Sequence, residues 1–442
     1  METSYIMDIK YLTRIFVWGC LLSFLPQTGF AQWTPVPGET QKHPVLLKGG
    51  ILHLGNGSVI ESGDILFVDG QIVAIGEVEP NQYGEELEEI SVAGKHIYPG
   101  LILPNSIIGL SEISAFKATY DHTEHGKFNP NLTTSYAFTS DSEIIPTLRY
   151  NGILIVEAAP GGGVISGSSS VMALDGWNWK DSMLKRGAMY LSWPAMKRRQ
   201  FDRGTGSIRL TDNSEYRKEV SEIRTLFIDA AGYGERIEKT SNLKLEAMQA
   251  VLNGEQSLFI EVDEPKGILE SIEFFRELGI EKLVIISAEG ALAVRDFLAK
   301  ENIPVIVPPT LSLPSGTDED YDLRYKLPFL LAEAGVKVAL SHSGSITEAR
   351  NLPFFAGVAV SQGMDKEEAL KLVTSNPADI LGVGDLVGTL EVGKHATLIV
   401  SEGDVLDITT NKIDMAFVQG RRLNLDNKQQ HMYTKYKEKY GK

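Results

Sequence analysis

The chain has 442 residues, 43% of them hydrophobic, which is enough for one large domain or two ordinary ones. Its formal net charge of -16 argues against a protein that binds nucleic acid through electrostatic attraction. Cys20 is the only cysteine. If the N-terminal segment is removed, disulfides, thiolate zinc sites and cysteine nucleophiles are therefore all excluded.

The N-terminal segment has the pattern of a secretory signal peptide. Lys10 and Arg14 precede the apolar run "IFVWGCLLSFL", and small residues follow up to Ala31. The run is shorter than the roughly 20 apolar residues needed to cross a bilayer. We therefore expect residues 1–31 to be cleaved near Ala31, which leaves a secreted or periplasmic protein with no membrane span.

Two β-rich blocks follow, one near each end of the chain. Residues 45–98 and 386–425 consist of short apolar segments separated by Gly, Asn-Gly and Asp-Gly, a pattern typical of hairpin-linked antiparallel strands. Each block is small for an independent domain, so we expect them to pack together as one β-sandwich. Residues 426–442 are polar, and we expect a surface tail there.

The region between the two blocks, residues 99–385, has a different pattern. Continuous apolar strands such as "EKLVIISAEG" and "GVKVALSHSG" alternate with amphipathic helical segments such as "PKGILESIEFFRELGI". This alternation indicates a parallel sheet buried on both faces, and the length suits an α/β fold of the (β/α)8 TIM-barrel type. Chemistry in such a barrel lies just beyond the carboxyl ends of the strands.

The segments "GKHIYPGLI", "GGGVISGSSSVMALDG" and "TSNPADILGVGDLVGTLEVGKHATLIV" together resemble the amidohydrolase superfamily, with imidazolonepropionase-like and dihydroorotase-like members most similar. The resemblance covers roughly residues 45–422 and is weakest over 175–245, which we treat as an insertion of uncertain form. The family resemblance implies hydrolysis of non-peptide C–N bonds in amides and cyclic amides. It also implies one or two divalent metals that activate water.

The positions that match the family's metal ligands have changed residue type. The His-x-His pair after the first barrel strand is replaced by Asn105 and Ile107. Glu261 and Glu289 lie where the histidines of the fifth and sixth strands are expected, and His342 lies at or beside the aspartate of the eighth. An amide oxygen is a poor zinc ligand and isoleucine is none. The resemblance thus predicts a pocket lined by these five residues.

Two hypotheses about function remain open. In the first, the chain is a pseudoenzyme without a metal, and it serves as a binding module for an unknown small molecule or as the partner of an intact amidohydrolase relative. In the second, Glu261, Glu289 and His342 hold one Zn, Mn or Fe ion and the chain is an active hydrolase. His342 could serve as a general acid or base in either case.

Overall fold

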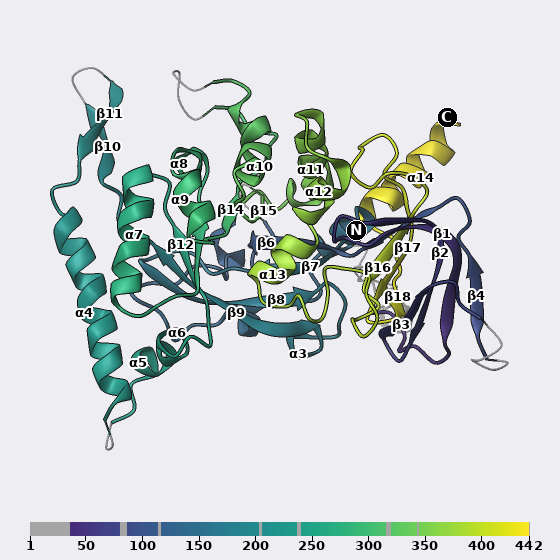
Figure 1. The fold of residues 1–442 in the computed structure, drawn as a ribbon, viewed down its shortest axis with the longest axis horizontal. Helices are drawn as coiled ribbons and strands as arrows, with labels where there is room; N and C mark the ends of the chain where they lie inside the picture. The colour runs from purple at the N-terminus through teal and green to yellow at the C-terminus, as the bar shows by residue number, and fades with distance from the viewer. Residues whose placement is uncertain are drawn as a thin grey trace, which may run out of the picture. The chain divides into compact units, whose positions relative to one another are not determined.

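The computed structural model describes residues 36–79, 86–113, 116–202, 206–236, 240–314, 320–342 and 344–441. The expected signal peptide, residues 1–31, lies outside the described residues. Within them, no helix is both long and apolar enough to cross a bilayer. Figure 1 shows the course of the chain, in which the purple strands of the N-terminal block and the yellow strands of the C-terminal block lie in the same part of the fold.

Strands from both ends of the chain form one eight-stranded sheet in the order β18-β17-β16-β5-β1-β2-β3, with β4 paired to β1. The bounds are β1 Val45–His53, β2 Val59–Val68, β3 Gln71–Gly76, β4 Glu88–Ser91, β5 His96–Pro99, β16 Leu398–Ser401, β17 Ile413–Val418 and β18 Arg421–Arg422. β5 joins the two chain ends, because it pairs with β1 in parallel and with β16 antiparallel. Hence neither terminal block completes this sheet by itself.

The terminal sheet folds back on itself as a sandwich does. Phe67 on β2 and Phe417 on β17 are four positions apart in the hydrogen-bonded order, yet their ring centroids are 5.1 Å apart. In a flat sheet that separation would be roughly 19 Å at about 4.8 Å per strand. The two rings belong to one buried cluster to which both chain ends contribute. The sheet built from both chain ends is therefore confirmed.

The second eight-stranded sheet forms the barrel, in the order β15-β14-β13-β12-β9-β8-β7-β6. Its strands are β6 Leu101–Ser106, β7 Ile153–Ala158, β8 Ile165–Ala173, β9 Met183–Ser192, β12 Leu258–Glu261, β13 Leu283–Ile286, β14 Val305–Val307 and β15 Val338–Leu340. Every strand contributes to one buried interior cluster, β9 with two residues and each of the others with one: Ile102, Ile155, Val171, Ala188, Tyr190, Phe259, Val284, Ile306 and Ala339. The barrel is a packed core, as expected for this fold.

A connecting segment completes the barrel between its first and last strands. The Leu340 N–H donates to the Leu372 carbonyl at 3.0 Å, and the Ile102 N–H donates to the Val373 carbonyl at 2.8 Å. The Ser341 hydroxyl donates to the Pro104 carbonyl at 2.8 Å. Residues 372–373 thus bridge β15 and β6, so the sheet is nearly closed.

The barrel differs from an all-parallel one in its third strand. β8 is antiparallel to both β7 and β9. In the segment "GGGVISGSSS" residues 162–164 form a bend, and Ile165–Ala173 is a fully buried strand. β9 lies inside the region 175–245 and is a barrel strand. The rest of that region contains the β10–β11 hairpin (Lys197–Asp202 and Ser207–Asp212) and the helix α4, Tyr216–Gly234.

Helices connect most of the remaining parallel strands and cover the outside of the sheet (Figure 1). They include α2 Ile145–Tyr150, α3 Trp179–Ser182, α5 Leu243–Ala247, α6 Gln249–Leu252, α7 Pro265–Glu277, α8 Glu289–Ala293, α9 Arg295–Lys300, α10 Leu323–Glu333, α11 Leu352–Ser361, α12 Lys366–Lys371 and α13 Ser375–Ile380. The polar C-terminal tail forms α14, Lys428–Tyr440, which has no buried residue.

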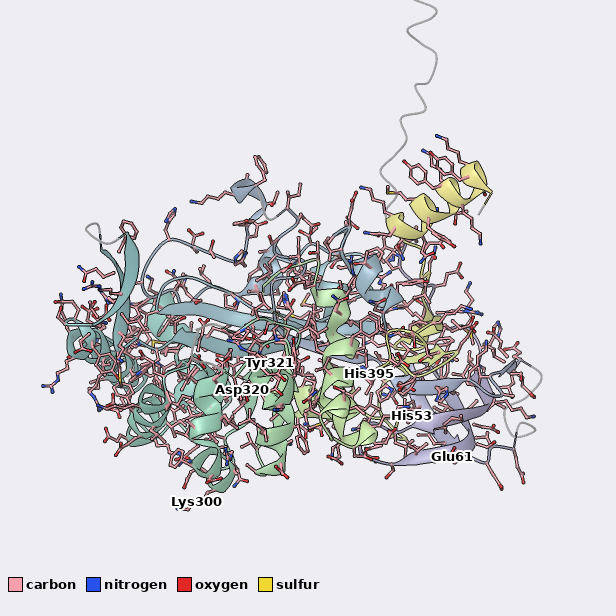
Figure 2. All side chains as sticks on the ribbon, turned by 90° about the horizontal axis from the view of Figure 1, so that it is seen from above. His53, Glu61, Lys300, Asp320, Tyr321 and His395 are labelled. Carbon is pink, nitrogen blue, oxygen red and sulfur yellow. The ribbon has the colours of Figure 1, made fainter. Side chains whose placement is uncertain are left out.

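Two polar links join the terminal sheet to the barrel. His53 on β1, labelled in Figure 2, lies with its Nδ1 2.7 Å from Glu367 Oε1 on α12. Asp175, which follows β8, accepts a hydrogen bond from Arg421 Nε on β18 at 2.9 Å and lies 3.4 Å from Arg149 Nη2 on α2. Both links are largely buried. The two sheets are thus fastened to each other by charged groups as well as by apolar packing.

Candidate functional site

A cavity of about 670 Å³ opens at the carboxyl ends of the barrel strands, and we call it the mouth cavity. Its lining comes from residues at or just after β6, β9, β12, β13, β14 and β15. Four of the five predicted pocket residues line it: Asn105, Ile107, Glu261 and His342. A larger cavity of about 820 Å³ lies at the opposite end of the strands. Because barrels of this kind carry their chemistry at the carboxyl ends, the smaller cavity is the candidate site.

Asn105, in the first histidine position, has a left-handed backbone with φ 49°. This conformation is held from inside the barrel, because the Asn105 N–H donates to Glu157 Oε2 at 3.0 Å. The Asn105 side-chain amide makes no hydrogen bond within the described part of the chain, so its donors and acceptor remain available to a ligand. Ile107, in the second position, packs against the core and adds an apolar wall.

Glu157 is a fully buried carboxyl group beneath the mouth cavity. Its Oε1 lies 2.6 Å from the Ser169 hydroxyl and its Oε2 lies 2.9 Å from the Tyr190 hydroxyl. Burial raises the pKa of Glu157 above its usual range, although these hydrogen bonds oppose the shift. The group therefore favours its neutral form and positions the end of the first strand.

His342 is held between two protein partners. Its Nδ1 lies 3.3 Å from the Ser345 carbonyl and its Nε2 lies 3.2 Å from the Ser106 hydroxyl. The carbonyl accepts only, so Nδ1 carries the proton and Nε2 accepts from Ser106. The residue is only 4% exposed, and burial lowers the pKa of His342 to about 4. Its imidazole is therefore neutral near pH 7.

The three carboxylates of the mouth cavity follow β12 at positions 261, 263 and 264. Glu261 accepts a hydrogen bond from the Ser192 hydroxyl at 2.9 Å. Asp263 Oδ1 accepts three, from the Ser287 hydroxyl and from two N–H groups at the start of α8. Glu264 accepts two backbone N–H groups of the loop after β9, at 2.7 and 3.1 Å. Asp263 and Glu264 thus organise the loops, whereas Glu261 is the least committed of the three.

Glu289, the fifth predicted pocket residue, does not line the mouth cavity. It begins α8 and forms an ion pair with Arg324 of α10. Glu261, Glu289 and His342 are therefore not brought together as a ligand set. More generally, the described residues contain no group of three His, Cys, Asp or Glu side chains placed to hold a metal ion. The donor set does not fit the metal centre that the family resemblance implies, so we derive no metal-dependent step.

Several residues of the site are not evident from the sequence. Asp263 and Glu264 look like the polar end of a strand before a helix, and only the fold shows that they bind two separate loops. The pairing of Ser106 with His342 joins residues 236 positions apart. Glu157 does carry a local signal, because it is the one charged residue in the apolar strand "ILIVEA", and buried acids are rare unless paired.

A sequence model described as the amidohydrolase family matches residues 324–423 of this chain. No curated protein sequence matches the chain. Among solved structures, an amidohydrolase from Thermotoga maritima aligns with a TM-score of 0.74 and 22% identity, over 86% of this chain and 99% of that one. The sequence model supports the resemblance to the amidohydrolase superfamily over residues 324–423, and the structural match shows that the fold is shared.

Two further structures have lower similarity. A prolidase complexed with N-methylphosphonate-L-proline aligns with a TM-score of 0.51 and 14% identity, over 86% of this chain and 99% of that one. A molinate hydrolase aligns with a TM-score of 0.50 and 15% identity, over 88% of this chain and 95% of that one. At these identities the likeness shows the fold alone, so the barrel predicted from the sequence is confirmed and the activity is not transferred.

Proposed function

We propose that this chain is an exported protein of amidohydrolase fold that binds a small molecule in the mouth cavity without the metal chemistry of the family. One observation carries the proposal: the two histidine positions after β6 hold Asn105 and Ile107, which cannot bind a catalytic zinc ion together. By resemblance the family hydrolyses non-peptide C–N bonds in amides and cyclic amides, and we infer that this activity is absent or weak in this chain.

The hydrogen bonds of the remaining candidate ligands support this function. A metal ligand needs a free lone pair, and a metal-bound histidine uses its second nitrogen for a second-shell partner. In His342 both ring nitrogens already have protein partners, while Glu289 is paired with Arg324 outside the mouth cavity. Among the described residues, Glu261 keeps Oε1 and Asp263 keeps Oδ2 without a partner. Two carboxylates without a third ligand are too few for a catalytic metal site.

The loss of ligands on an intact barrel also suggests a place for the chain in an assembly. The protein retains the barrel, the mouth cavity and the terminal sheet. A protein that no longer had a function would not need to keep them. We infer that it acts as a binding subunit beside an intact amidohydrolase relative that supplies catalysis. Export rests on the pattern of residues 1–31 and places this function outside the cytoplasm, in the periplasm or the medium.

The decisive test is the metal content of the mature protein, purified without affinity tags that bind metals. We expect less than about 0.1 equivalent of Zn, Mn or Fe by elemental analysis, and equal thermal midpoints with and without a chelator. Stoichiometric metal that is lost together with amidase activity in both Glu261→Ala and His342→Ala would overturn the proposal. Mass spectrometry of the exported chain tests the cleavage expected near Ala31.

A further inference from the structure

The charges around the mouth cavity are all of one sign. Its lining contains Glu261, Asp263 and Glu264 but no Lys or Arg. None of these three acids forms an ion pair with a basic side chain in the described ranges. The cavity at the opposite end of the barrel, in contrast, is lined by four basic side chains together with three acids. The absence of basic groups at the mouth is therefore a local feature and not a consequence of the acidic composition.

We propose that the mouth cavity binds a small organic cation, an amine or amidinium with an apolar body, whose charge is recognised by Glu261. This inference rests on the proposed function, because a metal-binding mouth would use the same carboxylate differently. The cavity supplies the site, and its uniform charge selects the class of ligand. Clefts lined by one sign of charge concentrate ions of the opposite sign.

The hydrogen bonds identify which atoms meet the ligand. Both oxygens of Glu264 already accept backbone N–H groups, whereas Asp263 uses Oδ1 for three donors and keeps Oδ2 as a second negative oxygen at the cavity. Glu261 receives one hydroxyl on Oε2, so its Oε1 is open to a charge-assisted hydrogen bond from an N–H group. The free amide of Asn105 offers an additional acceptor or donor across the cavity. These two residues come from β12 and β6, so they can hold two ends of one molecule.

The walls of the mouth cavity determine the rest of the ligand. Ile107, Trp193, Ile306 and Val307 line it with apolar surface. Cavities of roughly 300–1,000 Å³ suit small organic ligands, so there is room for a ring or short alkyl body besides the charged group. His342 brings no positive charge into the cavity near pH 7, because its imidazole is buried and neutral. A cation therefore meets no like charge on entering.

Four probes that share a benzyl group test the inference by isothermal titration calorimetry: benzylamine, benzyltrimethylammonium, benzyl alcohol and phenylacetate. We expect benzylamine to bind most tightly, because it has both the charge and N–H donors, and benzyltrimethylammonium, which has the charge alone, to bind more weakly. The alcohol should bind at least about tenfold more weakly than benzylamine, and phenylacetate should not bind. A charge-assisted hydrogen bond is worth about 1.5–3 kcal/mol, so Glu261→Gln should weaken benzylamine binding about tenfold or more. Glu273→Gln, an exposed change on α7, is the matched control and should leave binding unchanged.

Equal binding of all four probes, stronger binding of phenylacetate, or an unchanged affinity in Glu261→Gln would each overturn the cation inference. So would a failure of both cations to bind. These results are distinguishable from failure of the proposed function, because the metal content of the same samples reports that separately. Metal-free protein that prefers phenylacetate would retain the proposed function and lose the inference, whereas stoichiometric metal would remove the basis of both.

Discussion

Carboxylates at two places in the described part of the chain have opposite kinds of partner. At the joint between barrel and terminal sheet, Asp175 is buried and pairs with Arg149 and Arg421. At the barrel mouth, Glu261 and Asp263 are exposed and have only hydroxyl or N–H partners. A buried carboxylate that stays ionised without a cation is strongly destabilising, and at the joint the two arginines supply the opposite charge. The mouth leaves its acids uncompensated, which the fold does not require.

This difference shows how the partners of a carboxylate indicate its role. A carboxylate paired with arginines stabilises the fold, whereas one without a basic partner is available to a ligand. The acid of the joint holds together segments far apart in sequence: Asp175 also accepts the Gly38 N–H at 3.2 Å. The acids of the mouth accept hydrogen bonds only from neighbouring strand ends and loops, and Glu261 accepts the fewest of the three. Mutations at the two places should therefore separate stability from ligand binding.

The largest expected effect is at the joint. Asp175→Ala leaves two arginines with no carboxylate, one of them buried, and should reduce the free energy of unfolding by about 3–5 kcal/mol in urea denaturation. Asp296→Ala, on the exposed surface of α9, is the control and should change it by less than about 0.5 kcal/mol. A loss at Asp175 no larger than that of the control would mean that the joint does not depend on this charge network.

The next largest effect is the loss of folding stability at acid pH that His342 causes. Its folded-state pKa of about 4 lies below the roughly 6.5 of an unfolded chain, so the unfolded state binds the proton first as the pH falls. Stability should therefore be lost between about pH 6.5 and pH 4, by about 3 kcal/mol in total. His342→Asn should abolish that part of the pH dependence, as measured by urea denaturation across this range. The exposed control His125→Gln should retain it, and an unchanged slope in His342→Asn would contradict the burial argument.

The sequence predicts the architecture well because local patterns determine it. Continuous apolar strands alternating with helices are evident without tertiary information, and so is the hairpin pattern of the two chain ends. β8 is different, because three consecutive serines in a buried strand give no strand signal. Their hydroxyls are satisfied by distant partners: Gln256 for Ser168, Glu157 for Ser169 and Thr134 for Ser170.

The candidate site was predicted through the family resemblance and not through local patterns. The resemblance places Asn105, Ile107, Glu261 and His342 in the pocket, and in the structure they line the mouth cavity. It also places Glu289 there, but a position three residues past β13 already belongs to the next helix. Its orientation depends on Arg324, which lies 35 positions further along the chain. Partners that come from other elements decide where a polar side chain points.

A smaller effect is expected at the buried acid beneath the mouth. Because the pKa of Glu157 is raised in the folded state, the unfolded state loses its proton first as the pH rises. Stability should therefore fall with increasing pH from the unfolded-state pKa of about 4.3 up to the folded-state pKa. Glu157→Gln should remove this slope, whereas Glu157→Ala should cost about 1–3 kcal/mol by leaving the Asn105 N–H and the Tyr190 hydroxyl unsatisfied. Identical pH profiles for wild type and Glu157→Gln would show that the carboxyl group is ionised in the fold.

The smallest effect on stability should come from the residue that matters most for binding. Glu261→Gln keeps the shape of the side chain and loses only a charge that has no basic partner, so we expect the free energy of unfolding to change by less than about 0.5 kcal/mol. Glu264→Gln is the matched comparison within the mouth, and it should cost about 1 kcal/mol because the amide has one oxygen, so one of the two backbone N–H groups loses its acceptor. If Glu261→Gln were the more destabilising of the two in urea denaturation, its carboxylate would serve the fold. The carboxylate proposed to recognise the ligand would then stabilise the fold, as Asp175 does at the joint, and the two places would not differ in the role of their acids.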